Sequence, residues 1–160
     1  MKALSILLSI VVVLLVALIA FFFIGGTLGA QAHIVAVPAQ EQPEAFAAAA
    51  EAVQTGHAPR AFAQMEGDDP AAYTLVDITA SLKNNGLFAA EWATFTIEPG
   101  EGDVAVYSQS VESLDIAPRS GAEANFKVLA RGNGAGRTLR VEYYVLGMRR
   151  TVSLSIDSIE

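Results

Sequence analysis

The second half of the chain alternates apolar and polar residues with a period of two, and this pattern limits the fold more than any other feature. The alternation is clearest from Val76 to Leu82, from Ala122 to Ala130 and from Val152 to Ile156. Successive side chains of a strand point to opposite faces of a sheet, so each stretch has one apolar and one polar face. One buried face and one wet face are typical of antiparallel sheets.

Short turn sequences separate these stretches at regular intervals. They are rich in Gly, Asn, Asp and Pro, which favour tight turns and, apart from Pro, tolerate positive φ. We therefore expect six strands and a short seventh near 112–116, the six being 72–82, 87–98, 104–111, 122–131, 137–146 and 149–159. This spacing predicts a mainly β fold, an antiparallel immunoglobulin-like β-sandwich of six to seven strands over residues 71–160. The chain has no cysteine, so the disulfide of antibody domains is absent.

Two segments of this region carry a resemblance. In VDITASLKNNGLFAAEWATFTIEPGEG a strand ends in a Lys-Asn-x-Gly turn that leads into a second strand, and in LDIAPRSGAEANFKVLA an Ile-x-Pro turn leads into a Phe-x-Val strand. They resemble small bacterial sandwich domains of the adhesion-related (CARDB-like) and FxLYD-like kind. The resemblance covers about half of the chain. It implies the sandwich fold and a role in surface interactions, and it implies no catalytic residue.

An uncharged apolar run occupies residues 3–24 near the N-terminus. As a helix it would span roughly 33 Å, close to the ~30 Å hydrocarbon core of a bilayer. Signal-peptide apolar regions usually run about 7–15 residues, so the length favours a retained transmembrane anchor within residues 1–32. The alternative is cleavage after Ala32, because Ala30 and Ala32 fit the small-x-small pattern of a signal-peptidase site.

The charges beside the apolar run predict its orientation. Lys2 and the amino terminus are positive on one side, and on the other side the next positive residue is Arg60. Positive flanks stay in the cytoplasm. We therefore expect a single-pass cell-membrane protein that contacts the lipid bilayer through residues 3–24 and holds its C-terminal domain outside the cytoplasm.

Residues 33–70 are expected to form a linker that contains a spacer helix near 43–55. Pro43 suits the first helical position, the following alanines favour a helix, and Gly56 marks its end. Phe46 and Val53 fall on one face, which predicts that the helix packs against the main domain. A helix lying on a membrane surface is disfavoured because this segment has no Lys or Arg.

Charge and composition exclude several classes of function. Residues 33–118 hold 13 acidic and 2 basic residues, and the formal net charge of the whole chain is −7. Nucleic-acid binding depends on Lys and Arg that neutralise phosphates, so no nucleic-acid partner is expected. The absence of cysteine removes thiol catalysis and thiolate metal sites.

No set of residues predicts catalysis, a cofactor or a metal site. The two histidines, His33 and His57, fall in the expected linker and are interpreted as facing water. The carboxylates at Glu98, Glu101 and Asp103 match no calcium-loop spacing, so they are interpreted as a solvated acidic turn. The glycine-rich stretch at 132–136 opens no helix and is therefore expected to be a hairpin loop, not a phosphate site.

Four residues remain as candidates for surface contact. Tyr144 is expected to face outward because its neighbour Tyr143 shares the parity of the apolar positions of its strand. Trp92 is the second exposed-aromatic candidate, with burial in the core as the alternative. Arg149 and Arg150 follow a turn at the opposite end of the sheet from Arg131 and Arg137, so the arginines form two pairs and no single patch. Local ion pairs with Glu123, Glu142 or Asp157 are the simpler interpretation.

These observations favour a non-enzymatic protein, anchored in a membrane, that binds another envelope protein or takes part in an envelope assembly. A module that binds carbohydrate or cell-wall polymer through its exposed aromatic and arginine side chains is the alternative, secreted if the signal is cleaved. A purely structural spacer also agrees with the sequence.

Overall fold

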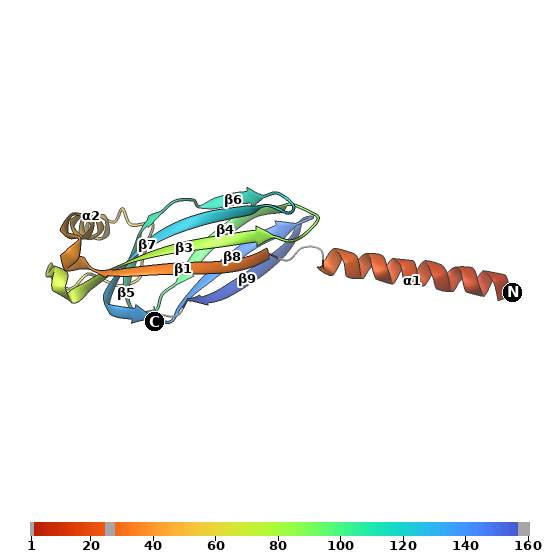
Figure 1. Cartoon of the computed structure of the whole chain (residues 1–160), viewed down its shortest axis with the longest axis horizontal. Helices are drawn as coiled ribbons and strands as arrows, with labels where there is room; N and C mark the ends of the chain where they lie inside the picture. The colour runs from red at the N-terminus through yellow and green to blue at the C-terminus, as the bar shows by residue number, and fades with distance from the viewer. Residues whose placement is uncertain (1, 25–27, 157–160) are drawn as a thin grey trace.

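The chain folds as an N-terminal helix followed by a two-sheet antiparallel β-sandwich (Figure 1). The computed structural model describes residues 2–24 and 28–156. Its two helices longer than one turn are α1 (Lys2–Ile24) and α2 (Pro43–Gln54). Sheet A has the order β1-β3-β7-β5-β2, with bounds β1 Leu28–Pro38, β2 Arg60–Ala61, β3 Tyr73–Asn84, β5 Glu101–Gln109 and β7 Gly121–Ala135. Sheet B has the order β6-β4-β8-β9, with bounds β4 Ala90–Glu98, β6 Ser113–Ile116, β8 Arg137–Val145 and β9 Met148–Ile156.

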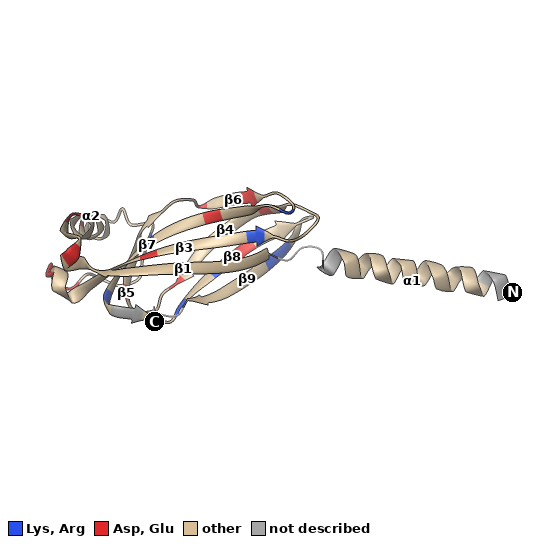
Figure 2. Ribbon diagram, in the orientation of Figure 1, with Lys and Arg blue, Asp and Glu red and all other residues tan. Residues whose placement is uncertain are grey.

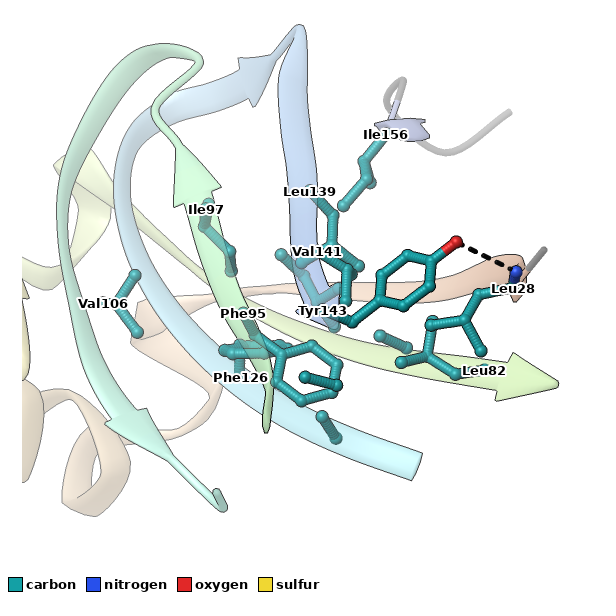
Figure 3. Packing of buried hydrophobic residues seen from close by; sticks show 14 of the residues in the cluster. Leu28, Leu82, Phe95, Ile97, Val106, Phe126, Leu139, Val141, Tyr143 and Ile156 are labelled. Atoms are coloured by element: carbon teal, nitrogen blue, oxygen red, sulfur yellow. Dashed lines mark hydrogen bonds between the residues drawn. The ribbon is translucent and has the colours of Figure 1, made fainter. Parts of the chain in front are cut away.

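The inward-facing residues of the two sheets form the main core. Phe95 of sheet B packs against Phe126 of sheet A with ring centroids 5.9 Å apart, and both lie among buried aliphatic side chains (Figure 3). Burying one such large apolar side chain stabilises the fold by about 1.5–3 kcal/mol. The alternating residues of β3 and β7 supply much of this core, which confirms the sandwich predicted from the period of two.

The spacer helix packs where the sequence predicts. Phe46 and Ala49 of α2 are buried against the outer face of sheet A, together with Tyr73 and Leu129. The rings of Phe46 and Tyr73 lie 5.5 Å apart. This second cluster and the main core are both formed by residues from Leu28 onward, so the sandwich contains its own complete interior.

The expected linker at residues 33–70 is wrong at its start, because β1 already belongs to the sandwich. This strand pairs with β3 along its whole length, from Leu28 opposite Asn84 to Pro38 opposite Thr74. Leu28 is buried, and its N–H donates a hydrogen bond to the Tyr143 hydroxyl, 3.3 Å away (Figure 3). The sandwich therefore begins at residue 28 and not at residue 71.

The expected hairpin at residues 132–136 is also wrong. β7 continues to Ala135 in sheet A, whereas β8 starts at Arg137 in sheet B. The chain passes between the two sheets at Gly136, whose φ is +76°. Glycine is the residue that adopts this conformation without steric cost.

A buried ion pair joins the two sheets at this crossing. Arg137 of β8 and Asp103 of β5 are almost fully buried, and the Arg137 Nε donates to both carboxylate oxygens of Asp103, at 2.8 and 3.0 Å. The Gly100 N–H donates to Asp103 Oδ2 at 2.8 Å. The interpretation of Asp103 as a solvated turn residue is therefore wrong, whereas Glu98 and Glu101 are exposed as expected.

The helix α1 exposes apolar side chains around its circumference. The described side chains run from Ser5 to Phe21, and its large apolar residues in that range are about half exposed. Within the described part of the chain, no helix has both the length and the apolar character needed to cross a membrane. The transmembrane anchor at residues 3–24 is not supported by this finding and stays a prediction.

We predict that Arg137→Ala lowers the free energy of unfolding of the sandwich by about 3–5 kcal/mol, because it leaves the buried Asp103 carboxylate without a counter-charge. Arg131→Ala is the matched control: its exposed ion pair with Glu66 is expected to contribute less than about 1 kcal/mol. Urea unfolding of the chain from Leu28 onward measures both. Equal losses for the two variants would contradict the importance of the buried pair.

Candidate functional site

Trp92 and Tyr144 lie side by side on the outer face of sheet B. Their ring centroids are 6.3 Å apart and their planes are inclined by 76°, an edge-to-face arrangement. Trp92 is 69% exposed and Tyr144 is 37% exposed, whereas Tyr143 is buried. The structure therefore places Tyr143 inward and Tyr144 outward, as predicted, and it places Trp92 outside the core.

A β-bulge sets the position of Trp92. The register between β4 and β8 shifts between Glu91 and Thr94, and Trp92 has a φ of +50°. The backbone N–H of Trp92 donates to the Asp115 carboxylate at 2.8 Å, and this hydrogen bond joins the bulge to β6. Bulges bend a strand and redirect a side chain, and here the indole is directed into solvent.

Arg149 continues the aromatic pair on the neighbouring strand. It lies opposite Tyr144 in the register of β8 and β9, and its guanidinium donates to Glu142 Oε1 at 2.5 Å. Arg140 contacts the same oxygen at 3.0 Å. The hydrogen bond from Arg149 is the main cause that lowers the pKa of Glu142 below its ordinary value. The local ion pair expected for this arginine is thus made with Glu142.

Arg150 lies apart from the other three candidates. It is paired with the inward-facing Tyr143, so it points to the other side of β9 from Arg149. Both arginines border a hollow of about 460 Å³ at this edge, together with Leu28 and Met148. The structure therefore brings together Trp92, Tyr144 and Arg149 on one surface and places Arg150 around the edge of sheet B.

The remaining candidates of the sequence are accounted for locally. Arg131 pairs with Glu66 at 2.6 Å and Arg137 with Asp103, at the opposite end of the sandwich from Arg149, so the predicted division of the arginines is confirmed. Glu123 lies 3.4 Å from the Ser81 hydroxyl, and Asp157 lies outside the described residues.

Both histidines lie at the surface. His33 is exposed on β1, and His57 is exposed and within 2.8 Å of the Thr55 hydroxyl. Among the described residues there is no group of three His, Cys, Asp or Glu side chains that could hold a metal ion.

An open groove of about 970 Å³ lies on the outer face of sheet A, at the end of the sandwich where β1 begins. We call this end the proximal end. Lys83 of β3 and Arg119 of the turn before β7 contribute its basic side chains, and Gly29 and Gly121 leave it open. The sequence did not predict this groove, because it depends on β1 lying beside β3.

The proximal end also collects unusual backbone conformations. Among the described residues, three that are not glycine have positive φ: Trp92, Arg119 and Leu146, at +50°, +60° and +51°. Each costs about 1–2 kcal/mol relative to an ordinary conformation. All three are exposed, so packing of their side chains does not offset the cost. Leu146 and Gly147 form a two-residue hairpin turn with positive φ at both positions, where Asn-Gly is the usual choice.

The two ends of the sandwich differ in charge (Figure 2). The end that carries α2 exposes mainly carboxylates, namely Glu41, Glu44, Glu51, Glu66, Asp68, Asp69, Glu98 and Glu101. The proximal end carries residues of both signs: the basic Lys83, Arg119, Arg149 and Arg150 and the acidic Glu91, Asp115, Glu123 and Glu142. The acidic excess seen along the sequence therefore lies mainly at the α2 end.

Comparison with known proteins leaves the family open. No family model matches the sequence, and no curated protein matches it. Among solved structures, the GAE domain of GGA2p from Saccharomyces cerevisiae has 10% identity and a TM-score of 0.43, covering 62% of this chain and 86% of its own. A PapD-like domain of human CEP192 has 21% identity and a TM-score of 0.39, covering 54% and 73%.

A FixG-related protein from Vibrio parahaemolyticus is similar at 10% identity with a TM-score of 0.36, covering 81% of this chain and 95% of its own. These likenesses are to immunoglobulin-like, PapD-like and GAE sandwich domains, and at this level they carry no functional argument.

We predict that Arg149→Ala raises the pKa of Glu142 toward its ordinary value, and that Arg140→Ala raises it less. The hydrogen bond from Arg149 is the largest cause of the lowered pKa. Because the folded-state pKa is lowered, the small stabilisation from this pair is present at neutral pH and fades as the pH falls through the folded pKa. A titration of the Glu142 carboxyl carbon by NMR measures both shifts, and a larger effect of Arg140→Ala would contradict the assignment.

Proposed function

We propose that this protein is a membrane-anchored, non-enzymatic sandwich protein that stands outside the cytoplasm and binds another envelope protein. The observation that carries the proposal is the apolar helix α1, which precedes a sandwich domain with its own hydrophobic core by only three residues. The large apolar side chains of α1 are about half exposed from Ile6 to Phe21. An apolar surface of this extent needs a lipid or protein surrounding. The proposal takes residues 3–24 as the embedded segment.

The position of β1 supports retention of this segment. Ala30, Gln31 and Ala32 lie in the middle of paired strand, opposite residues 80–82 of β3. Cleavage after Ala32 would remove the buried Leu28 and would leave half of β3 as an unpaired edge. Exposed strand edges favour aggregation. We therefore prefer the retained anchor over the cleaved signal, with Lys2 on the cytoplasmic side.

The acidic end is the proposed contact surface for the protein partner. It surrounds α2, which packs on sheet A through Phe46 and Ala49 and leaves Glu44, Ala47 and Glu51 exposed. Excess charge of one sign speeds association with an oppositely charged partner and selects it over others. The partner surface is therefore proposed to be basic.

We also propose that the sandwich is similar to adhesion-related (CARDB-like) and FxLYD-like domains. This proposal rests on the turn at Lys83–Gly86. Asn84 is buried there, and its amide donates to the carbonyl oxygens of Phe88 at 2.8 Å and Ile116 at 3.0 Å. Its side-chain oxygen accepts from the Gly86 N–H at 2.9 Å. This network gives the Asn of the motif a structural role, because it joins β3 to β6 of the other sheet.

One observation favours the carbohydrate-binding alternative, namely the exposed edge-to-face pair of Trp92 and Tyr144. On that alternative, Tyr144→Ala lowers retention of the purified chain on cell-wall polymer. Retention that is absent in the native chain, or unchanged by this substitution, would contradict it.

We predict that the full chain with a C-terminal tag remains with membranes after alkaline extraction, and that external protease removes the tag from intact spheroplasts. Both results follow if α1 is embedded and the sandwich lies outside the cytoplasm. A tag that is protected until the membrane is opened would contradict the orientation. A chain extracted with peripheral proteins would contradict the anchor.

The partner is tested with a photoreactive amino acid at position 47 of the full chain. We predict a cross-linked product with one defined protein. The double change Glu44→Lys and Glu51→Lys is expected to lower the yield of this product by about fivefold or more. The same photoreactive residue at position 153, on the outer face of sheet B, is the control and is expected to give no such product. Equal cross-linking from both positions would contradict a specific acidic contact.

A further inference from the structure

We infer that the proximal end of the sandwich rests on an anionic lipid surface, with Leu146, Trp92 and Arg119 in contact with the headgroup layer. The inference builds on the proposed anchoring by α1 and adds a second membrane contact made by the folded domain itself.

The short connection to α1 places this end at the membrane. Only residues 25–27 separate Ile24 from Leu28, and a fully extended chain across that gap reaches at most about 14 Å. The polar layer on each side of a bilayer is about 5–8 Å thick. If α1 ends at the edge of the hydrocarbon, Leu28 lies within or just above the headgroups.

Several turns reach the same level as Leu28. It is paired with Asn84, and the Asn84 N–H donates to the carbonyl oxygen of Ser120 at 2.9 Å. The Tyr143 hydroxyl accepts from Leu28, two residues before the β8–β9 turn begins at Val145. The β3–β4 loop, the β6–β7 turn and the β8–β9 turn are therefore all presented at the proximal end.

The side chains at this end have the composition of a membrane-contacting surface. Exposed apolar residues extend from the loop and the hairpin turn, namely Leu87, Leu146 and Met148. Around them are the basic side chains of Lys83, Arg119, Arg149 and Arg150. Trp92 and Tyr144 lie one or two residues farther along their strands from the turns of the proximal end. Tryptophan and tyrosine are enriched at the level of the headgroups.

Four acidic residues lie near this end, and one of them, Glu123, lines the same groove as Lys83 and Arg119. Asp115 accepts the Trp92 N–H, and Glu142 is bound by Arg140 and Arg149. Glu91 is exposed opposite Tyr144. By contrast, within the described residues Lys83 and Arg119 have no ion-pair partner, and both line the open groove of sheet A. Basic side chains next to a membrane favour anionic lipids over neutral ones.

The backbone gives an independent argument. The three non-glycine residues with positive φ among the described residues are an aromatic, a basic and an aliphatic residue, and all three are exposed at this one end. Conformations that cost stability persist where function requires the side chain. A domain selected for stability alone would carry Gly or Asn at positions 119 and 146.

Trp92 provides the measurement, because it is the only tryptophan of the 160 residues. The full chain is reconstituted into vesicles of phosphatidylcholine alone or of phosphatidylcholine with phosphatidylglycerol, with some lipids brominated near the top of the acyl chain. We expect Trp92 emission to shift to shorter wavelength in the anionic vesicles and to be quenched at least twofold more by bromolipid there than in the neutral vesicles.

Two substitutions separate the apolar from the basic contribution without loss of the fold, because asparagine tolerates positive φ. Leu146→Asn is expected to reduce the quenching in both kinds of vesicle. Arg119→Asn is expected to remove much of the difference between anionic and neutral vesicles. Arg131→Asn, at the acidic end, is the matched control and is expected to leave both values unchanged.

Flotation of the same vesicles distinguishes this inference from the proposed anchoring. A chain that floats with both lipids while Trp92 keeps the emission of a water-exposed indole and is not quenched overturns the inference and leaves the anchor in place. Quenching that is equal in the native chain, Leu146→Asn and Arg119→Asn also overturns it. A chain that does not float overturns both the anchor and the inference.

Discussion

The pairing of β1 with β3 is the constraint on which the remaining structure depends. It runs through eleven residue pairs from Leu28 to Pro38, and it covers the edge of β3 that would otherwise be unpaired. Because β1 begins only four residues after Ile24, the same strand that completes the sheet also fixes which end of the domain is near the helix. The location of the proximal end and the open groove beside Lys83 both follow from this one register.

The two ends of the sandwich use charged residues in different ways. At the α2 end, Asp103 and Arg137 are buried and join the sheets, while the exposed carboxylates remain in solvent. At the proximal end, basic side chains lie at the surface beside exposed Leu146 and Trp92. Burial of an ion pair adds little stability relative to apolar residues but makes the loss of either partner costly. The α2 end thus contains a buried ion pair between the sheets, and the proximal end exposes basic and apolar side chains at its surface.

The alternation of the sequence was enough to predict strands β3 to β9 and the inward face of Tyr143, because a period of two follows directly from strand geometry. It did not reveal β1, although Ala30, Ala32 and Ile34 alternate with polar or exposed neighbours. The small alanines and the adjacent apolar run weakened that signal. The crossing at Gly136 and the burial of Asp103 depend on contacts between two sheets, which local patterns do not contain. The bulge at Trp92 likewise depends on its partner strands.

The central claim is that the sandwich starts at Leu28 and stays joined to α1. The intact mass of the protein isolated from cells that express the natural full-length chain tests it most directly. We expect a mass that retains residues 28–32 together with the N-terminal helix, in the membrane fraction. A mature chain that begins at His33 would lack half of β1 and would contradict the account.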